Sequence, residues 1–184
     1  MGFQTFLGFA PFLAFALVEK LVGVVPGLLT GFAVSLALVG WEAARTRSFN
    51  ILEAGSAVIF GGLTLLVVSL NQTWSVWQVR LFVDAGLALV VFLSILFGRP
   101  FTLQHARTSA TADARRDPAF MRHNTILSGV WGLAFVGLTL IDFYMTTPGV
   151  PDRRGIVLTL GILAIAAQLT QSYVRKIRRA SGDG

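Results

Sequence analysis

Three ionisable side chains lie inside apolar stretches of this 184-residue sequence. Arg80 and Asp84 are one helical turn apart, shortly after Trp77, and Asp142 lies near the end of a later apolar stretch. A central Asp or Arg costs roughly 2.5–3.5 kcal/mol on membrane-insertion scales, so such residues often mark binding or transport sites. Arg80, Asp84 and Asp142 are therefore the candidate intramembrane polar site. They would converge on an outward-facing pocket; alternatively, Arg80 and Asp84 neutralise each other locally and Asp142 reaches interfacial water.

The sequence contains no motif typical of a catalytic, cofactor-binding or metal-binding site. It contains no cysteine, which excludes disulfides, thiolate metal sites and cysteine nucleophiles. His105 and His123, with Asp113 and Asp117 between them, have a spacing that matches no known metal-ligand signature. Glycine-rich phosphate loops, GxSxG elbows and HExxH helices do not occur. We therefore predict a protein that is not an enzyme, with no catalytic, cofactor-binding or metal-binding residues.

The composition indicates that these residues are positioned by transmembrane helices. Hydrophobic residues make up 54% of the chain and charged residues only 13%, with a mean hydropathy of +0.71. A soluble domain of this size could not bury so much apolar surface and would lack the charge to cover its exterior. We predict an all-α fold, a polytopic transmembrane helix bundle within residues 1–174, followed by a basic tail at 175–184.

Six apolar stretches can be delimited, most of them near the roughly 20 residues that a helix needs to cross a bilayer. They are Phe3–Val18, Pro26–Ala43, Ile51–Leu70, Trp77–Phe97, Asn124–Met145 and Gly155–Tyr173. The first is short and contains Pro11, which is expected to kink it. We interpret the N-terminal part as a helical hairpin that turns between Glu19 and Gly27. The alternative is five spans plus a re-entrant segment.

The basic residues are distributed unevenly between the connections. Eleven of the fifteen Lys and Arg residues lie in the even-numbered loops and the tail, which the positive-inside rule places in the cytoplasm together with the C-terminus. The long loop 99–122 supplies the candidate contacts for anionic lipid headgroups or a cytoplasmic partner: Arg99, Arg107, Arg115, Arg116 and Arg122. Because no basic stripe is interleaved with aromatic residues, nucleic acid is not an expected partner.

Two parts of the chain resemble each other. The run 60–66 (FGGLTLL) is similar to 135–141 (FVGLTLI), and each is followed by an arginine near the start of the next helix, Arg80 or Arg154. A glycine then follows at Gly86 or Gly161. Some transporter folds contain parallel repeats of this kind. Because transmembrane segments are built from few residue types, chance similarity is the alternative to a true repeat.

Several landmarks follow one another along the chain: the N-terminal Phe6–Pro11, the run Val58–Leu65 in the third apolar stretch, the polar turn Asn71–Trp77, the helix end Arg99-Pro100, and Phe120 followed by Asn124. Their order resembles the intracellular septation protein A family of bacterial inner-membrane proteins. Asp142-Phe143-Tyr144 replaces the family's Asn-x-Tyr, displaced by about one helical turn, and the segment 101–107 also differs. The chain thus looks like a divergent member or an architectural relative.

This resemblance implies a non-enzymatic role in cell-envelope integrity and septation, through contacts with division and cell-wall synthesis proteins at the bacterial plasma membrane. It supplies no catalytic residues. The residues themselves favour an alternative, a small-solute or ion transporter or channel subunit that uses Arg80, Asp84 and Asp142. Six helices can surround one small site, particularly in a homo-oligomer.

Overall fold

The computed structural model describes residues 10–46, 51–71, 73–103 and 117–180 of the chain, and the regular structure in these ranges is α-helical. The helices are α2 (Ala10–Val22), α3 (Val24–Thr46), α4 (Ile51–Ser69), α5 (Val76–Leu96), α7 (Pro118–Met145) and α8 (Asp152–Ala180). Five of them, α3, α4, α5, α7 and α8, are long and apolar enough to cross a membrane. The prediction of an all-α, multi-pass membrane protein is confirmed.

The N-terminal helices α2 and α3 form a hairpin, as predicted, with its turn at Gly23. This glycine has a φ of +113°, a conformation that L side chains rarely adopt. Gly27 lies so close to α2 that a Cβ there would be 2.9 Å from the Cβ of Glu19. The predicted turn between Glu19 and Gly27 contains Gly23, but its last residues, Val25–Gly27, form the first turn of α3, where Pro26 needs no backbone N–H donor. The described part of α2, Ala10–Val22, has 13 residues.

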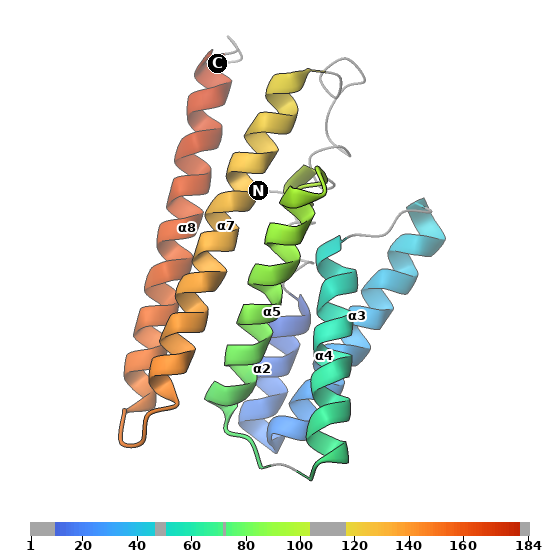
Figure 1. Ribbon diagram of the computed structural model, residues 1–184, viewed down its shortest axis with the longest axis vertical. Coiled ribbons are helices and arrows are strands. Elements are labelled where there is room, and N and C mark those ends of the chain that lie inside the picture. Colours follow the sequence, from blue (N-terminus) through green and yellow to red (C-terminus); the bar gives the residue numbers. More distant parts are fainter. Residues whose placement is uncertain (1–9, 47–50, 72, 104–116, 181–184) are drawn as a thin grey trace.

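The helices stand in a row that follows the order of the chain (Figure 1). Extensive contacts join α3 to α4, α4 to α5, α5 to α7, and α7 to α8, while α2 packs on α3. The Phe12 and Phe15 rings of α2 also lie 5.3 Å and 5.7 Å from the Phe60 ring of α4. The outer helices of the row are therefore α3 and α8, and α5 lies in its interior.

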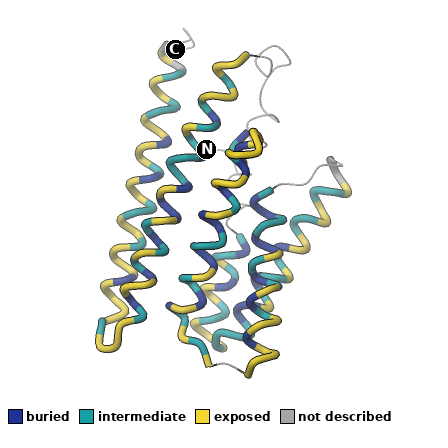
Figure 2. Tube along the Cα trace, viewed as in Figure 1, coloured by how far each residue is buried: buried dark blue, intermediate teal, exposed yellow. Residues whose placement is uncertain are grey.

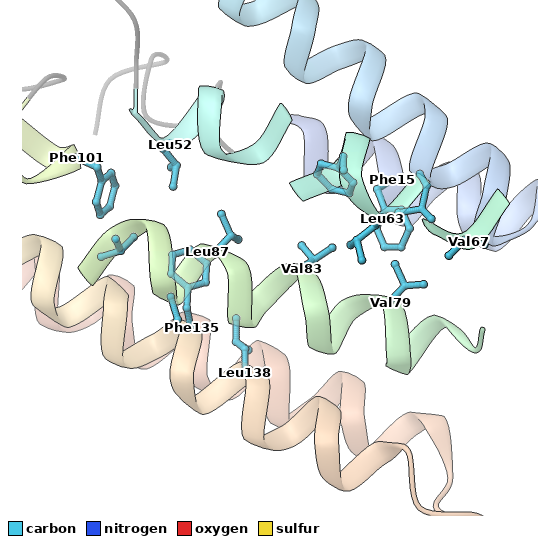
Figure 3. Close-up of a cluster of buried hydrophobic side chains, with 14 residues drawn as sticks. Phe15, Leu52, Leu63, Val67, Val79, Val83, Leu87, Phe101, Phe135 and Leu138 are labelled. Carbon is cyan, nitrogen blue, oxygen red and sulfur yellow. The ribbon is translucent and has the colours of Figure 1, made fainter. Parts of the chain in front are cut away.

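The buried apolar side chains follow the interior helix along its length. Val79, Val83 and Leu87 of α5 lie between Leu63 of α4 and Leu138 of α7 (Figure 3). Exposed positions run along the outer surfaces, most continuously on α8 (Figure 2). Large apolar residues are exposed there because the hydrocarbon of a bilayer is as apolar as they are.

The bundle has two faces at opposite ends of its helices, and these faces differ in charge. One end, which we call the basic end, carries Arg99 after α5, Arg122 near the start of α7, and Arg175, Lys176 and Arg179 near the end of α8. The other, which we call the turn end, contains the short connections between α2 and α3, α4 and α5, and α7 and α8. It carries Lys20, Arg80, Arg153 and Arg154.

Both long C-terminal helices extend beyond their predicted limits. Asp117 caps α7, since its side chain accepts a hydrogen bond from the Ala119 N–H at 2.8 Å, and Pro118 occupies the first turn. Helix α8 continues to Ala180, so the first part of the predicted tail forms its last turns. Cationic side chains are favourable there because the helix dipole is negative at its C-terminus.

Candidate functional site

Arg80 is positioned by the ordered start of α5. Ser75 and Gln78 form a capping box, in which the Gln78 side chain accepts from the Ser75 N–H at 2.9 Å and the Ser75 hydroxyl accepts from the Gln78 N–H at 3.3 Å. Arg80 therefore lies within the first two turns of the helix, at the turn end. Its guanidinium connects α5 to both later helices.

The principal partner of this guanidinium is Asp142 of α7. Arg80 Nε lies 3.4 Å from Oδ1 of Asp142, and Arg80 Nη2 donates a hydrogen bond to Oγ1 of Thr159 at 3.0 Å. Asp142 is fully buried, with 0% of its surface exposed. Among the described residues, none donates a hydrogen bond to either of its carboxylate oxygens. Arg80 thus provides the charge compensation for Asp142.

Asp84 completes the group, which we call the Arg80 cluster: Arg80, Asp84, Asp142 and Thr159. Asp84 is buried one turn along α5 from Arg80, and its carboxyl group neighbours that of Asp142 across the α5–α7 interface. The three residues singled out in the sequence therefore lie together. Arg80 pairs with Asp142 on another helix, and Asp142 is buried, so its expected alternative position in interfacial water is wrong.

Trp77 and Asp152 extend the cluster toward solvent. The Arg80 Cζ atom lies 4.9 Å from the centre of the Trp77 ring system, in the range of a cation–π contact. The Trp77 indole N–H donates to Oδ1 of Asp152 at 2.7 Å. A Cβ at Gly155 would overlap the Trp77 ring, so a glycine there permits α8 to approach α5.

Trp77, Asp152 and Thr159 were not among the residues predicted for this site. Asp152, Gly155 and Thr159 are spaced by three and four residues along α8, so they share one face of the helix. This spacing of small and polar residues is the sequence signal that could have identified the face of α8 that contacts α5.

Glu19, near the end of α2, is the remaining acidic group at this end. It lies within electrostatic reach of Arg80 and Asp152. Partial burial raises the pKa of the Glu19 carboxyl above its ordinary value, and the positive charge of Arg80 lowers it by less. The expected convergence of polar residues at one face of the membrane thus includes Glu19.

The candidate contacts at the basic end are not gathered into one site. Arg99 and Arg122 are exposed, whereas Arg107, Arg115 and Arg116 lie outside the described residues. The segment after Arg99 folds back onto α7, where Thr102 Oγ1 donates to the Asn124 carbonyl oxygen at 2.8 Å. His123 Nδ1 lies 2.9 Å from the Tyr173 hydroxyl.

No group of three or more His, Asp or Glu side chains in the described part of the chain could hold a metal ion. His105 and Asp113 lie outside that part.

No family model, curated protein or solved structure matches this chain. The likeness to septation proteins consequently rests on the sequence landmarks alone.

Proposed function

We propose that this multi-pass membrane protein moves protons across the membrane and that the Arg80 cluster is its proton-binding site. The observation that supports this most strongly is the Arg80–Asp142 ion pair, with Asp84 beside it, inside helices long enough to span a bilayer. Ionisable residues inside membrane helices characteristically form ion pathways and proton relays.

Charge balance makes the proton the best candidate ligand. One guanidinium and two carboxylates leave one negative charge without compensation. An uncompensated buried charge costs several kcal/mol, and one proton bound by the Asp84–Asp142 pair removes it. A metal ion is less suitable, because the Arg80 guanidinium already lies against Asp142.

The polar residues of the turn end give the proton a route to solvent. Asp152 is exposed and holds Trp77, which in turn covers Arg80. Toward the basic end, the apolar side chains of Leu87, Val91 and Phe135 follow next in the buried core around α5. Transport to the other side therefore requires a rearrangement of α5 against α7.

The test is proton entry into vesicles that contain the purified protein and a trapped pH-sensitive dye, driven by a potassium diffusion potential. We expect wild-type vesicles to acidify faster than empty ones, and Asp84→Asn and Asp142→Asn to abolish the difference. Arg154→Gln, which removes an exposed charge at the same end, is the matched control and should retain it. Wild-type vesicles that behave like empty ones would refute proton transport.

A second function is favoured by the exposed face of α8. Gln168 and Gln171 are exposed within the apolar stretch Gly155–Tyr173, where an amide without a polar partner is unfavourable. A second helix that covers them would satisfy both donors and acceptors. Together with the family resemblance, this supports the proposal of an envelope or septation scaffold in a bacterial plasma membrane, with the basic end and the C-terminus in the cytoplasm.

The scaffold proposal is tested by cross-linking in cells and mass spectrometry of the recovered proteins. Gln168→Leu should reduce the recovery of division and cell-wall synthesis proteins, whereas Val157→Leu, an apolar change elsewhere on exposed α8, should leave it unchanged. Recovery of none of these proteins with the wild-type chain would contradict this function.

A further inference from the structure

An apolar groove lies between α4 and α5 at the basic end, away from the Arg80 cluster. It has a volume of about 630 Å³. Its lining comes from the start of α4 and the end of α5: Ile51, Gly55, Val90, Leu93, Ser94 and Phe97, with Arg99 beyond them. The groove thus combines a hydrocarbon-like wall with one cationic group at its end.

The wall is apolar although Ser94 contributes to it. The Ser94 hydroxyl donates to the Val91 carbonyl oxygen at 2.7 Å, so its hydrogen-bonding capacity as a donor is used within α5. At Gly55, α4 approaches α5 so closely that a Cβ would lie 2.8 Å from the Val90 side chain. The two helices therefore close the groove at one side, and the exposed Leu93 and Phe97 border it.

Arg99 is held at a defined position relative to this wall. Gly98, with a φ of +66°, turns the chain after α5, and the Arg99 N–H donates to the Ser94 carbonyl oxygen at 2.8 Å. Pro100 is buried and prevents the helix from continuing. The backbone of Arg99 is thus fixed just after the end of α5, while its side chain is exposed.

We propose that this groove binds an anionic phospholipid, with an acyl chain along α4 and α5 and the phosphate held by Arg99. The guanidinium offers a fork of N–H donors that matches phosphate oxygens. One acyl chain of the lipid suits the apolar lining. The positive charge of the basic end favours an anionic headgroup. The occupant is a lipid of the leaflet at the basic end.

Native mass spectrometry of the purified full-length protein tests this, with phosphatidylglycerol and phosphatidylcholine of identical acyl chains as probes. We expect the wild type to retain phosphatidylglycerol preferentially. Arg99→Gln should reduce its retention roughly tenfold, which corresponds to about 1.4 kcal/mol, because the charged hydrogen bonds to the phosphate are lost. Arg122→Gln, the same charge change at an exposed position of the basic end outside the groove, should leave retention unchanged.

A second variant addresses the hydrocarbon part. Leu93→Trp adds volume to the groove from an exposed position, so it should reduce the retention of both lipids while circular dichroism shows the helices intact. Equal retention of both lipids by the wild type would overturn the proposal. So would an equal loss in Arg99→Gln and Arg122→Gln, or a wild-type dimer that Leu93→Trp dissociates, because the groove would then take a second copy of the chain.

Discussion

The hairpins α4–α5 and α7–α8 have similar sequences but place different chemistry at equivalent positions. Extending the similar runs 60–66 and 135–141 by one residue aligns Val67 with Asp142. Both side chains are buried, with 2% and 0% of their surface exposed. Because an apolar residue fills this position in α4, helix packing alone does not require a carboxylate in α7. The comparison supports a functional reason for Asp142.

The arginines that follow the two runs differ in the same way. Arg80 contacts Asp142, Thr159 and Trp77, whereas Arg154 is exposed. The hairpins also pack differently. A Cβ at Gly86 would lie 2.8 Å from the Ile59 side chain of α4, while a Cβ at Gly161 would have no neighbour within 4 Å among the described residues. The inner hairpin is packed from several sides, and α8 leaves one side for lipid or a partner.

The largest effect is expected when α7 is made like α4 by Asp142→Val. This breaks the Arg80–Asp142 ion pair and leaves Asp84 as the remaining carboxylate near Arg80. Removal of one member of a buried ion pair typically costs 3–5 kcal/mol, and the loss should lie at the lower end of that range because Asp84 remains. The free energy of unfolding can be measured by SDS titration in mixed micelles, with Val67→Ile as the control at the equivalent position. A loss of less than about 1 kcal/mol would mean that the ion pair contributes little.

The double variant Arg80→Leu/Asp142→Val should recover most of that loss. Replacement of a whole buried ion pair by apolar residues is often neutral or stabilising, and a proton bound by Asp84 leaves the site without net charge. We expect a stability within about 2 kcal/mol of the wild type and no proton flux in vesicles. A double variant that is stable and still moves protons would separate the ion pair from transport.

The two helical glycines of α8 should respond oppositely to added volume. Gly155→Leu drives a side chain into Trp77 and should cost roughly 1–3 kcal/mol. Gly161→Ala meets no described neighbour and should be neutral or stabilising by up to about 1 kcal/mol, because alanine favours helix over glycine. Equal effects in the SDS titration would show that α8 is not docked through Trp77.

The smallest effects concern Trp77 and Arg154. Trp77→Phe retains a ring near Arg80 but removes the N–H donor to Asp152, at an expected cost of about 1 kcal/mol. Arg154→Gln should change the unfolding free energy by less than about 0.5 kcal/mol, since the residue is exposed. Thermal unfolding in detergent distinguishes them, and a larger loss in Arg154→Gln would contradict the assigned asymmetry of the hairpins.

Much of the fold was predictable because hydrophobic length is a strong local signal. Each of the six apolar stretches overlaps one described helix, and the N-terminal hairpin was the favoured interpretation. The predicted turn extended too far, to Gly27, because Pro26 looks like a break, although proline is tolerated in the first turn of a helix. Helix α7 begins earlier than the predicted Asn124, because Asp117 caps it and Pro118 occupies its first turn.

Which residues form the candidate site could be predicted from the sequence, but which of them form the ion pair could not. Asp84 is four residues from Arg80 in the sequence, yet the ion pair forms with Asp142 on another helix. Which helix face turns toward which neighbour depends on packing along the whole interface, and a single sequence does not specify that rotation. Asp152 and Thr159 were missed for the same reason, since their partners lie on α5.

Proton binding by the Arg80 cluster can be tested directly by infrared spectroscopy of the protein in lipid at neutral pH. Exposed carboxylates are ionised under these conditions, so the carbonyl band of a protonated carboxylic acid reports a proton held inside the protein. Proton binding by the Arg80 cluster predicts such a band, its loss in Asp84→Asn and Asp142→Asn, and its retention in Asp117→Asn, which changes an exposed capping residue. A wild-type spectrum without the band, or a band that both cluster variants retain, would contradict proton binding at this site.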